Sequence, residues 1–295
     1  MRHLAIAATQ MACTWDRAKN IARAAEMVGE AAARGAQIVL LQELFETPYF
    51  CIDKDRAFFR EATTVADNPA IRAMRRLARE HDVVIPVSFF ERDGEQYYNS
   101  LAVIDAGGEL LGVYRKSHIP DFPDYEEAFY FAPGDTGFMV FETKFARVGA
   151  AICWDQWFPE AARIMAVRGA EVLLYPTAIG RPVAAPTNQF QNSKPHWQRT
   201  MQGHAGANLM VLAASNRIGA EAGVTGQTQF YGGAFIADHT GDKVAEAGES
   251  DSEVIVHRFD LDAIASYRAN WGIFRTRRPD LYAPILTHRA PDETP

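Results

Sequence analysis

The chain has 295 residues, of which 48% are hydrophobic and 23% are charged, so it is long enough for one large domain or two small ones. Its 30 Lys and Arg against 37 Asp and Glu give a formal net charge of −7. No block of basic residues stands out, which argues against nucleic acid or an anionic membrane as a partner. No run approaches the roughly 18 consecutive apolar residues of a membrane span.

Patterns typical of strands and helices alternate along the chain. Met1–Gln10 is apolar only briefly and indicates a first strand rather than a signal peptide. Apolar residues recur at helical spacing from 17 to 34, and Gly35 is placed to end that helix. Asp105–Gly108 and Asp238–Gly241 are typical of hairpin turns. We predict strands at 4–10, 37–42, 83–90, 98–105, 110–115, 138–141, 146–152, 171–175, 209–214, 232–237 and 253–259, and helices at 17–34, 69–81, 158–168 and 195–207.

Helices between strands on a chain of this length predict a layered α/β fold. No internal repeat is visible. The longest irregular stretch, 180–193, is rich in Pro, Ala, Asn and Gln, and a loop of that length in a compact domain is usually functional.

Three cysteines, Cys13, Cys51 and Cys153, are an odd number and lie far apart in the sequence. They form neither a disulfide framework nor a zinc pattern, so we expect no metal and a reducing, cytoplasmic environment. A free cysteine is ordinarily a small buried hydrophobe. Cys153, however, lies where an apolar strand runs into an aromatic, polar turn within 147–160. A strand followed by a nucleophile and a sharp bend presents a reactive side chain and frees the following backbone N–H groups for an oxyanion.

Two other predicted strands end in charged residues. Glu43 follows the apolar run 37–42, and Lys116 follows the strand at 110–115. Taken singly, Glu43 is read as a cap of the next segment and Lys116 as part of a solvated loop. Parallel strands of one sheet bring their carboxyl ends to one edge, where α/β folds bind ligands. A carboxylate, an ammonium and the thiol of Cys153 are therefore expected to converge.

Three segments, 41–50, 114–121 and 152–160, resemble the signature motifs of the nitrilase, or carbon–nitrogen hydrolase, superfamily. The chain is most similar to its branch that hydrolyses N-carbamoylputrescine, a reaction of polyamine biosynthesis. The similarity runs from about 5 to 287, so we predict a single domain at 1–288 and a C-terminal tail at 289–295. The resemblance implies a four-layer αββα sandwich, no cofactor, and pairing of helix faces into a homo-oligomer, a dimer or larger.

The chemistry of amide cleavage needs a nucleophile, a base, an acid for the leaving ammonia and a group that holds the oxyanion. The resemblance assigns Cys153 as nucleophile, Glu43 as general base and later acid, and Lys116 as electrostatic stabiliser. We expect the Lys116 ammonium to lower the pKa of the thiol. The backbone N–H of Trp154 would complete the oxyanion hole. Glu127 matches a second family glutamate that orients the lysine, the alternative being a solvated loop acid.

The substrate is less clearly indicated than the reaction. Enzymes of the family that act on N-carbamoyl amino acids carry arginine two or three residues after the nucleophile, where this chain has Asp155 and Gln156. An acidic group there opposes an anionic substrate and favours a small carbamoyl amine. The alternatives are an N-carbamoyl amino acid, a simple aliphatic amide, or a non-catalytic scaffold of the same fold.

Several positions depart from the carbamoylputrescine pattern. Phe122 and Asp124 replace glycines, Ala128 replaces a lysine, and the loop 181–192 lacks the usual acids. A substrate with a distal ammonium needs a carboxylate, and Asp124 is the candidate. An anionic substrate would instead require Arg181 as its anchor. The sequence leaves both readings open.

Overall fold

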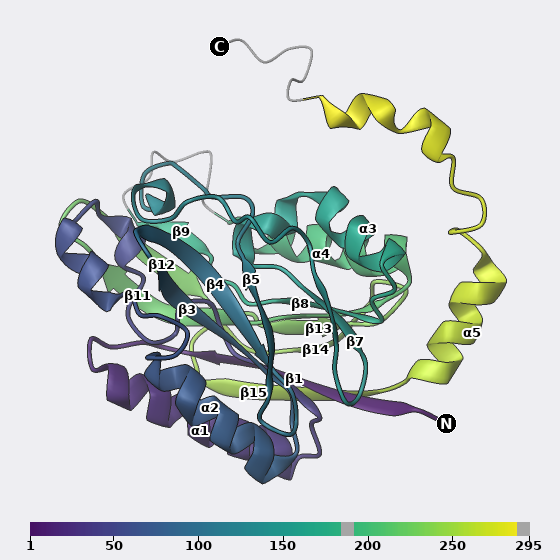
Figure 1. Ribbon diagram of the computed structural model, residues 1–295, viewed down its shortest axis with the longest axis horizontal. Coiled ribbons are helices and arrows are strands. Elements are labelled where there is room, and N and C mark those ends of the chain that lie inside the picture. The colour runs from purple at the N-terminus through teal and green to yellow at the C-terminus, as the bar shows by residue number, and fades with distance from the viewer. Residues whose placement is uncertain (184–191, 288–295) are drawn as a thin grey trace.

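The computed structural model describes residues 1–183 and 192–287. Two facing β-sheets form its centre, with helices covering the outer face of each (Figure 1). The predicted four-layer αββα sandwich is therefore confirmed. The predicted tail at 289–295 lies outside the described residues, as does the part of the 181–195 loop from 184 to 191.

The first sheet combines parallel and antiparallel neighbours. Its strand order is β15 (Glu253–Asp260), β1 (His3–Met11), β11 (Asn216–Ala222), β12 (Gln227–Tyr231) and β9 (Gly180–Pro182), with β2 (Ile38–Leu40) also paired to β1. A parallel bridge between Ile38 and Val84 connects this sheet to an antiparallel meander. The meander comprises β3 (Ile85–Asp93), β4 (Gln96–Ile104) and β5 (Leu110–Arg115).

The second sheet lies across the core from the first. Its strand order is β14 (Lys243–Glu246), β13 (Phe235–Ala237), β10 (Val211–Ala214), β8 (Val172–Tyr175), β7 (Arg147–Ala150) and β6 (Val140–Glu142). The central β10, β8 and β7 run parallel to one another. Their buried, uninterrupted apolar sequences are typical of strands covered on both faces.

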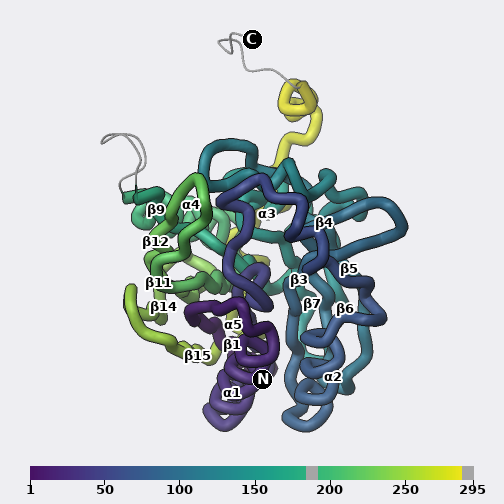
Figure 2. The backbone as a smooth tube through the Cα atoms, turned by 90° about the vertical axis from the view of Figure 1, so that its left-hand side faces the viewer, coloured from purple at the N-terminus to yellow at the C-terminus, as the bar shows by residue number. Residues whose placement is uncertain are grey.

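Helices α1 (Arg17–Ala33) and α2 (Pro69–His81) cover the first sheet, and α3 (Pro159–Val167) and α4 (Lys194–Asn208) cover the second (Figures 1 and 2). Side-chain caps begin the first two helices, since Asp16 accepts from Lys19 N and Asn68 from Ile71 N. In β1, Leu4 and Ile6 face the core between the sheets, whereas Ala7 packs toward α1 and α2. This alternation holds the two middle layers together.

Both predicted hairpin turns are present, at 105–108 and 238–241, and the predicted helices match to within a few residues. The prediction missed β9, β11, β12, β14 and α5 (Leu261–Trp271). Most of these elements are half-exposed and polar, so their residues lack a clear apolar period. From α5 onward the chain leaves the body through short 3-10 turns at Pro279–Leu281 and Ala283–Leu286 (Figure 1).

The expectation that one parallel sheet gathers the three reactive side chains is wrong. β2 belongs to the first sheet, β5 to the antiparallel meander, and β7 to the second sheet. The ends of β5 and β7 meet across the sandwich instead, and the chain after β2 turns away early through Leu44, whose φ is +48°. The residues converge, but at an edge shared by the two middle layers.

Candidate active site

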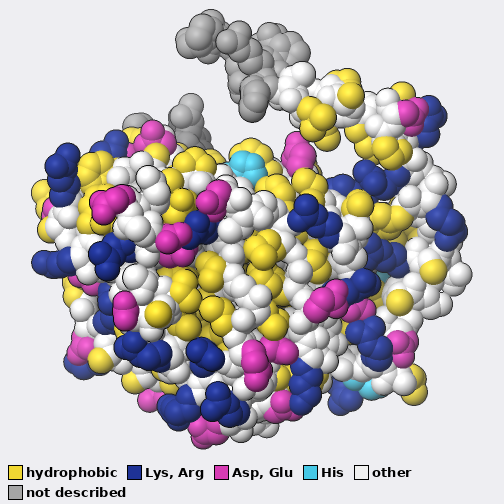
Figure 3. Space-filling model, in the orientation of Figure 1, with side chains coloured by type: hydrophobic (Ala, Val, Ile, Leu, Met, Phe, Trp, Pro, Cys, Tyr) yellow, Lys and Arg dark blue, Asp and Glu magenta, His cyan; other side chains and the backbone are white. Residues whose placement is uncertain are grey.

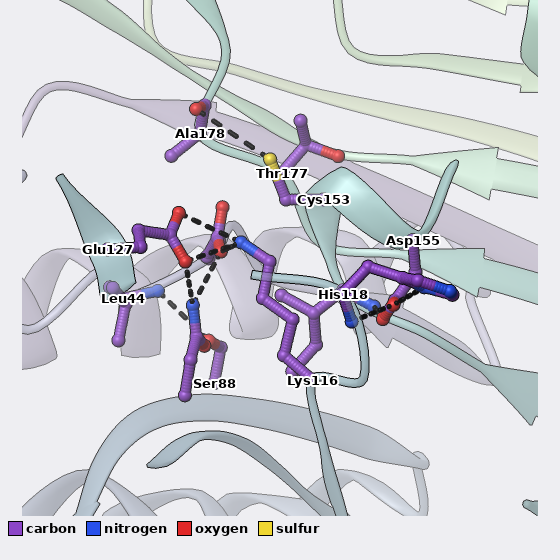
Figure 4. Close-up of polar contacts among 12 residues, drawn as sticks. Leu44, Ser88, Lys116, His118, Glu127, Cys153, Asp155, Thr177 and Ala178 are labelled. Atoms are coloured by element: carbon purple, nitrogen blue, oxygen red, sulfur yellow. Dashed lines mark hydrogen bonds and ion pairs between the residues drawn. The ribbon is translucent and has the colours of Figure 1, made fainter. Parts of the chain in front are cut away.

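Cys153 occupies a strained bend directly after the β7 strand region. Its φ is +40°, in the left-handed region that side-chain-bearing residues rarely adopt, and it begins a short 3-10 helix, Cys153–Trp157. Its backbone N donates to Pro176 O at 2.9 Å. Its Sγ lies 3.8 Å from Ala178 O (Figure 4). The predicted sharp bend at the thiol is confirmed.

Lys116 lies between two carboxylates in the interior of the protein. Its Nζ is 2.9 Å from Glu43 Oε1, and 2.8 and 2.7 Å from Glu127 Oε1 and Oε2 (Figure 4). All three side chains are fully buried. Glu127 comes from a 3-10 turn, Glu127–Phe129, after β5. The interpretation of Glu127 as a solvated loop acid is therefore wrong, and Lys116 is no solvated loop residue either.

The two carboxylate oxygens of Glu43 have different surroundings. Oε1 accepts from Lys116 Nζ and from Asn99 Nδ2, the latter at 2.7 Å. Oε2 is buried and has no hydrogen-bond partner among the described residues. A buried acceptor without a donor is costly unless a substrate or reacting group satisfies it. This oxygen is suited to accept a proton in the site.

Burial and mutual attraction set the protonation of the lysine and its partners. Burial alone would lower the pKa of Lys116, but Glu127 and Glu43 together raise that pKa well above its usual range. Burial raises the pKa of Glu127, which Lys116 opposes and Glu43 reinforces. Lys116 therefore stays an ammonium at neutral pH, held between the two carboxyl groups.

Burial likewise controls the thiol. Burial raises the pKa of Cys153 well above its usual range, the Glu43 carboxylate raises it further, and Lys116 lowers it. Lys116 lowers the pKa of the thiol as expected, but burial and Glu43 raise that pKa by more. Cys153 therefore rests as a thiol and must lose its proton to a base during attack.

Two neighbours of the charged cluster were not predicted as site residues. Tyr49 donates from its hydroxyl to Glu127 Oε1 at 2.6 Å, and Asn99 Nδ2 reaches both Glu43 and, at 3.4 Å, Glu127 Oε2. Both side chains are buried. Asn99, with Ser100 beside it, interrupts the apolar residues of β4, which is a signal that sequence reasoning had available, since a polar side chain inside a buried strand requires a partner.

Arg217, on β11, holds the loop that carries Glu43. Its guanidinium is fully buried and donates to Glu43 O and Leu44 O, each at 2.9 Å. It also forms an ion pair of 2.8 Å with Glu221, whose carboxylate accepts from Tyr49 N. These bonds fix the backbone on both sides of the left-handed Leu44 and so aim Glu43 into the site.

A cavity of about 610 Å³ opens onto the thiol. Aromatic rings dominate its wall. The ring centroids of Phe122 and Trp154 lie 5.2 Å apart, and those of Trp157 and His196 lie 4.8 Å apart. Among the described residues that line it there is no Asp, Glu, Lys or Arg. The lining residues are Pro120, Phe122, Tyr125, Cys153, Trp154, Gln156, Trp157, Ile179, Gly180, Pro182, Asn192, Ser193 and His196.

The three residues predicted to bind substrate have different positions. Trp154 lines the cavity next to Cys153. Asp124 packs instead against Gly226 at the turn between β11 and β12, where burial and the neighbouring carboxylates Asp53 and Glu126 raise its pKa. Arg181 is exposed on β9, between two residues that line the cavity, so its side chain points to the opposite face. The structure brings neither charged residue to the cavity wall.

Asp155 does not lie at the cavity wall, where the sequence-based expectation about the substrate placed it. Asp155 is fully buried, does not line the cavity, and accepts hydrogen bonds from Tyr114 and His118. It therefore does not contact a substrate in the cavity, as the expectation required. Gln156 does line the cavity, and its Oε1 accepts from Trp197 Nε1 at 2.7 Å.

No group of three or more His, Cys, Asp or Glu side chains in residues 1–183 and 192–287 is arranged to hold a metal ion. None of the helices found there is long and apolar enough to cross a membrane.

Comparison with known proteins identifies the family. Residues 5–269 match the carbon–nitrogen hydrolase family. The chain is 55% identical over 290 residues to an N-carbamoylputrescine amidase of Arabidopsis thaliana, covering 97% of this chain and 96% of that one. It is 47% identical over 286 residues to a citrullinase of Francisella tularensis, covering 97% and 99%.

A solved structure has the same fold. The crystal structure of a carbon–nitrogen hydrolase from Helicobacter pylori G27 matches with a TM-score of 0.91 and 35% identity, over 98% of this chain and all of that one. The predicted superfamily is therefore confirmed. The chain belongs to the carbon–nitrogen hydrolase family of the nitrilase superfamily and is a hydrolase of amides or ureides.

Proposed function

We propose that Cys153, Glu43 and Lys116 form a catalytic triad that hydrolyses an N-carbamoyl amine, N-carbamoylputrescine, to putrescine, ammonia and CO2. The main support for this mechanism is the state of the buried Glu43 carboxylate. Lys116 and Asn99 bind one of its oxygens, and its other oxygen has no hydrogen-bond partner among the described residues. A base held in this way is ready to take the proton of a protonated thiol. Glu127 supports the triad by holding Lys116 charged and in place.

The first half of the reaction forms a covalent intermediate. The Cys153 sulfur attacks the ureido carbon while its proton passes to Glu43 Oε2, and the carbonyl electrons move onto oxygen. The Lys116 ammonium and the backbone N–H of Trp154 stabilise that oxyanion. The C–NH2 bond then breaks, ammonia leaves with the proton from Glu43, and an S-linked thiocarbamate remains on Cys153.

The second half reverses these roles. Glu43 takes a proton from water, which attacks the thiocarbamate carbon, and the C–S bond breaks with return of a proton to the thiolate. The N-substituted carbamic acid that leaves decomposes to CO2 and the free amine. No step changes an oxidation state, and water is the nucleophile of the second half.

The substrate rests on whole-chain similarity to enzymes named for N-carbamoylputrescine. Citrulline, also a ureide, is the second candidate, because a relative of 47% identity is named citrullinase. A carboxylate-specific site would carry a cation in the cavity wall, and the described lining residues include neither Lys nor Arg. The same residues include neither Asp nor Glu, so the wall offers no carboxylate to the ammonium of the amine either, and the choice of the amine rests on the whole-chain similarity.

A substrate panel tests the proposal. Ammonia release should be fastest from N-carbamoylputrescine, slower from citrulline, and slowest from N-carbamoyl-β-alanine and simple aliphatic amides. The comparison uses kcat/KM, since only that ratio measures discrimination between competing substrates. Faster turnover of N-carbamoyl-β-alanine than of N-carbamoylputrescine would reject the amine, and no turnover of any compound would favour the non-catalytic scaffold.

We also propose that the protein is a single domain over 1–288, assembles into a homo-oligomer and works in the cytoplasm. Large apolar side chains are exposed on α3, α5 and the C-terminal segment, including Val167, Trp271 and Leu286. Hydrophobic side chains gather along the C-terminal segment, where it extends away from the body of the protein (Figure 3). Such surface usually marks a protein contact. The described cysteines are free thiols, which suits a reducing compartment.

A further inference from the structure

Asp155 is a buried carboxylate that binds the segments on both sides of the active site. Its side chain is fully buried, and the two oxygens accept four hydrogen bonds. Oδ2 accepts from Tyr114 Oη at 2.6 Å and Ile152 N at 3.0 Å. Oδ1 accepts from His118 N at 3.0 Å and His118 Nδ1 at 2.7 Å. The donors come from two segments far apart in sequence.

Two of these donors flank Lys116. Tyr114 is two residues before the lysine and His118 is two residues after it, so Asp155 holds the lysine segment at both ends. Burial beside the carboxylate raises the pKa of Tyr114 well above its usual range, which keeps its hydroxyl a donor. The His118 ring stacks on Phe158 with centroids 3.5 Å apart, and this fixes its orientation toward Asp155 (Figure 4).

The other contacts enclose Cys153. Asp155 accepts from Ile152 N through its side chain and donates from its own backbone N to Ile152 O at 3.0 Å. The nucleophile lies between these two residues in its left-handed conformation. Reciprocal bonds across a strained residue oppose its relaxation to an ordinary φ. The same carboxylate therefore restrains the bend at the thiol and the segment of the lysine.

We infer that Asp155 is a positioning residue, which sets Cys153 and Lys116 relative to each other without touching the substrate. It does not line the cavity. All four of its partners are donors, so only a carboxylate satisfies them; an amide would place an NH2 group against a donor. The inference rests on the proposed triad.

The role predicts a specific kinetic change. Misplacement of the thiol relative to the oxyanion-stabilising ammonium is felt in the transition state rather than in substrate binding. Asp155→Asn should lower kcat by about a hundredfold and leave KM within about threefold. kcat is referred to the number of folded active sites, so that a loss of folded protein is not counted as a loss of rate.

A pair of tyrosine variants serves as a matched test that keeps the carboxylate. Tyr114→Phe removes a hydroxyl bound to Asp155 and should lower kcat by about tenfold. Tyr175→Phe is the control, because its hydroxyl is equally buried and has no hydrogen-bond partner among the described residues. Its kcat should stay within about twofold of the wild type. His118→Ala should lose rate, and His118→Asn, which restores a donor, should recover part of it.

The outcomes separate this inference from the triad. Wild-type kcat in Asp155→Asn, beside an inactive Cys153→Ser, would overturn the role of Asp155 and leave the triad standing. A rise in KM without a fall in kcat would make Asp155 a binding residue and overturn the inference as well. If Asp155→Asn does not fold, equal kcat in Tyr114→Phe and Tyr175→Phe overturns it. An active Cys153→Ser would overturn the triad first and the inference with it.

Discussion

The buried cluster around Lys116 and the cavity that opens onto Cys153 differ in their chemistry. In the cluster, the carboxylates of Glu43 and Glu127 each lie within hydrogen-bond distance of the Lys116 ammonium, and all three side chains are fully buried. The described wall of the cavity is lined mainly by aromatic rings and amides and includes no Asp, Glu, Lys or Arg. Charges in a low-dielectric interior tolerate little change, whereas an uncharged wall accommodates many shapes.

This contrast explains why the type of reaction is well defined and the choice of substrate is not. The reaction depends on a few charges that must all be present. The choice of substrate depends on a wall that can vary without unfolding the protein. Relatives of similar identity are accordingly named for different ureides, an N-carbamoylputrescine amidase and a citrullinase.

The largest effect is expected at the nucleophile. Cys153→Ser and Cys153→Ala should each reduce turnover to below about one per cent, since a serine hydroxyl gives up its proton less readily than a thiol and is the weaker nucleophile, and alanine has no nucleophile. Stability should change little, because among the described residues the sulfur forms only a weak hydrogen bond, to Ala178 O at 3.8 Å. Steady-state assays and thermal unfolding measure the two quantities. Activity above that level in either variant would refute covalent catalysis by Cys153.

The next largest effect is expected at the lysine. Lys116→Ala leaves Glu43 and Glu127 buried without their counter-charge, which should destabilise the fold by about 3–5 kcal/mol. In the protein that remains folded, kcat should fall far more than KM, because the ammonium acts mainly on the oxyanion. Lys144→Ala is the matched control, since that lysine pairs with Asp82 in solvent. An effect of Lys116→Ala on KM alone would reduce the lysine to a binding residue.

The same contrast separates what sequence could predict from what it could not. Glu43, Lys116 and Cys153 were predicted because they lie at the ends of apolar strands within short motifs, and Glu127 because it matches a second glutamate of the family. The strands of the core were predicted because full burial leaves uninterrupted apolar runs. The sheet arrangement was not, since pairing between distant strands leaves no local pattern.

The sequence-based prediction mainly missed residues that contact the site from distant parts of the chain. Asn99, Tyr49 and Arg217 act on the triad from other elements, and no spacing in the sequence connects them to it. The prediction for Asp155 was wrong although the residue is close to the nucleophile in sequence. That closeness suggested contact with substrate, but the 3-10 turn directs its carboxylate into the interior. Local sequence places a side chain near a site without giving its direction.

The smallest effects are expected at Asp124 and Arg181, the two charges first considered for the distal end of the substrate. Asp124 packs against Gly226, Arg181 points away from the cavity, and neither lines its wall. Asp124→Asn and Arg181→Ala should therefore change KM for N-carbamoylputrescine and for citrulline by less than about twofold. Asp121→Asn, which alters an exposed acid of the same loop, is the control.

The opposite result would be equally informative. A hydrogen bond from a substrate ammonium to the Asp124 carboxylate would contribute about 1.5–3 kcal/mol, so its loss would raise KM at least tenfold for the amine and leave neutral amides unchanged. Such a change would show that Asp124 turns from Gly226 toward bound substrate, and that the outer cavity acquires a charge only when occupied. A similar rise in KM for citrulline in Arg181→Ala would show that Arg181 turns toward the carboxylate of that substrate. Without either change, the aromatic wall alone selects the substrate.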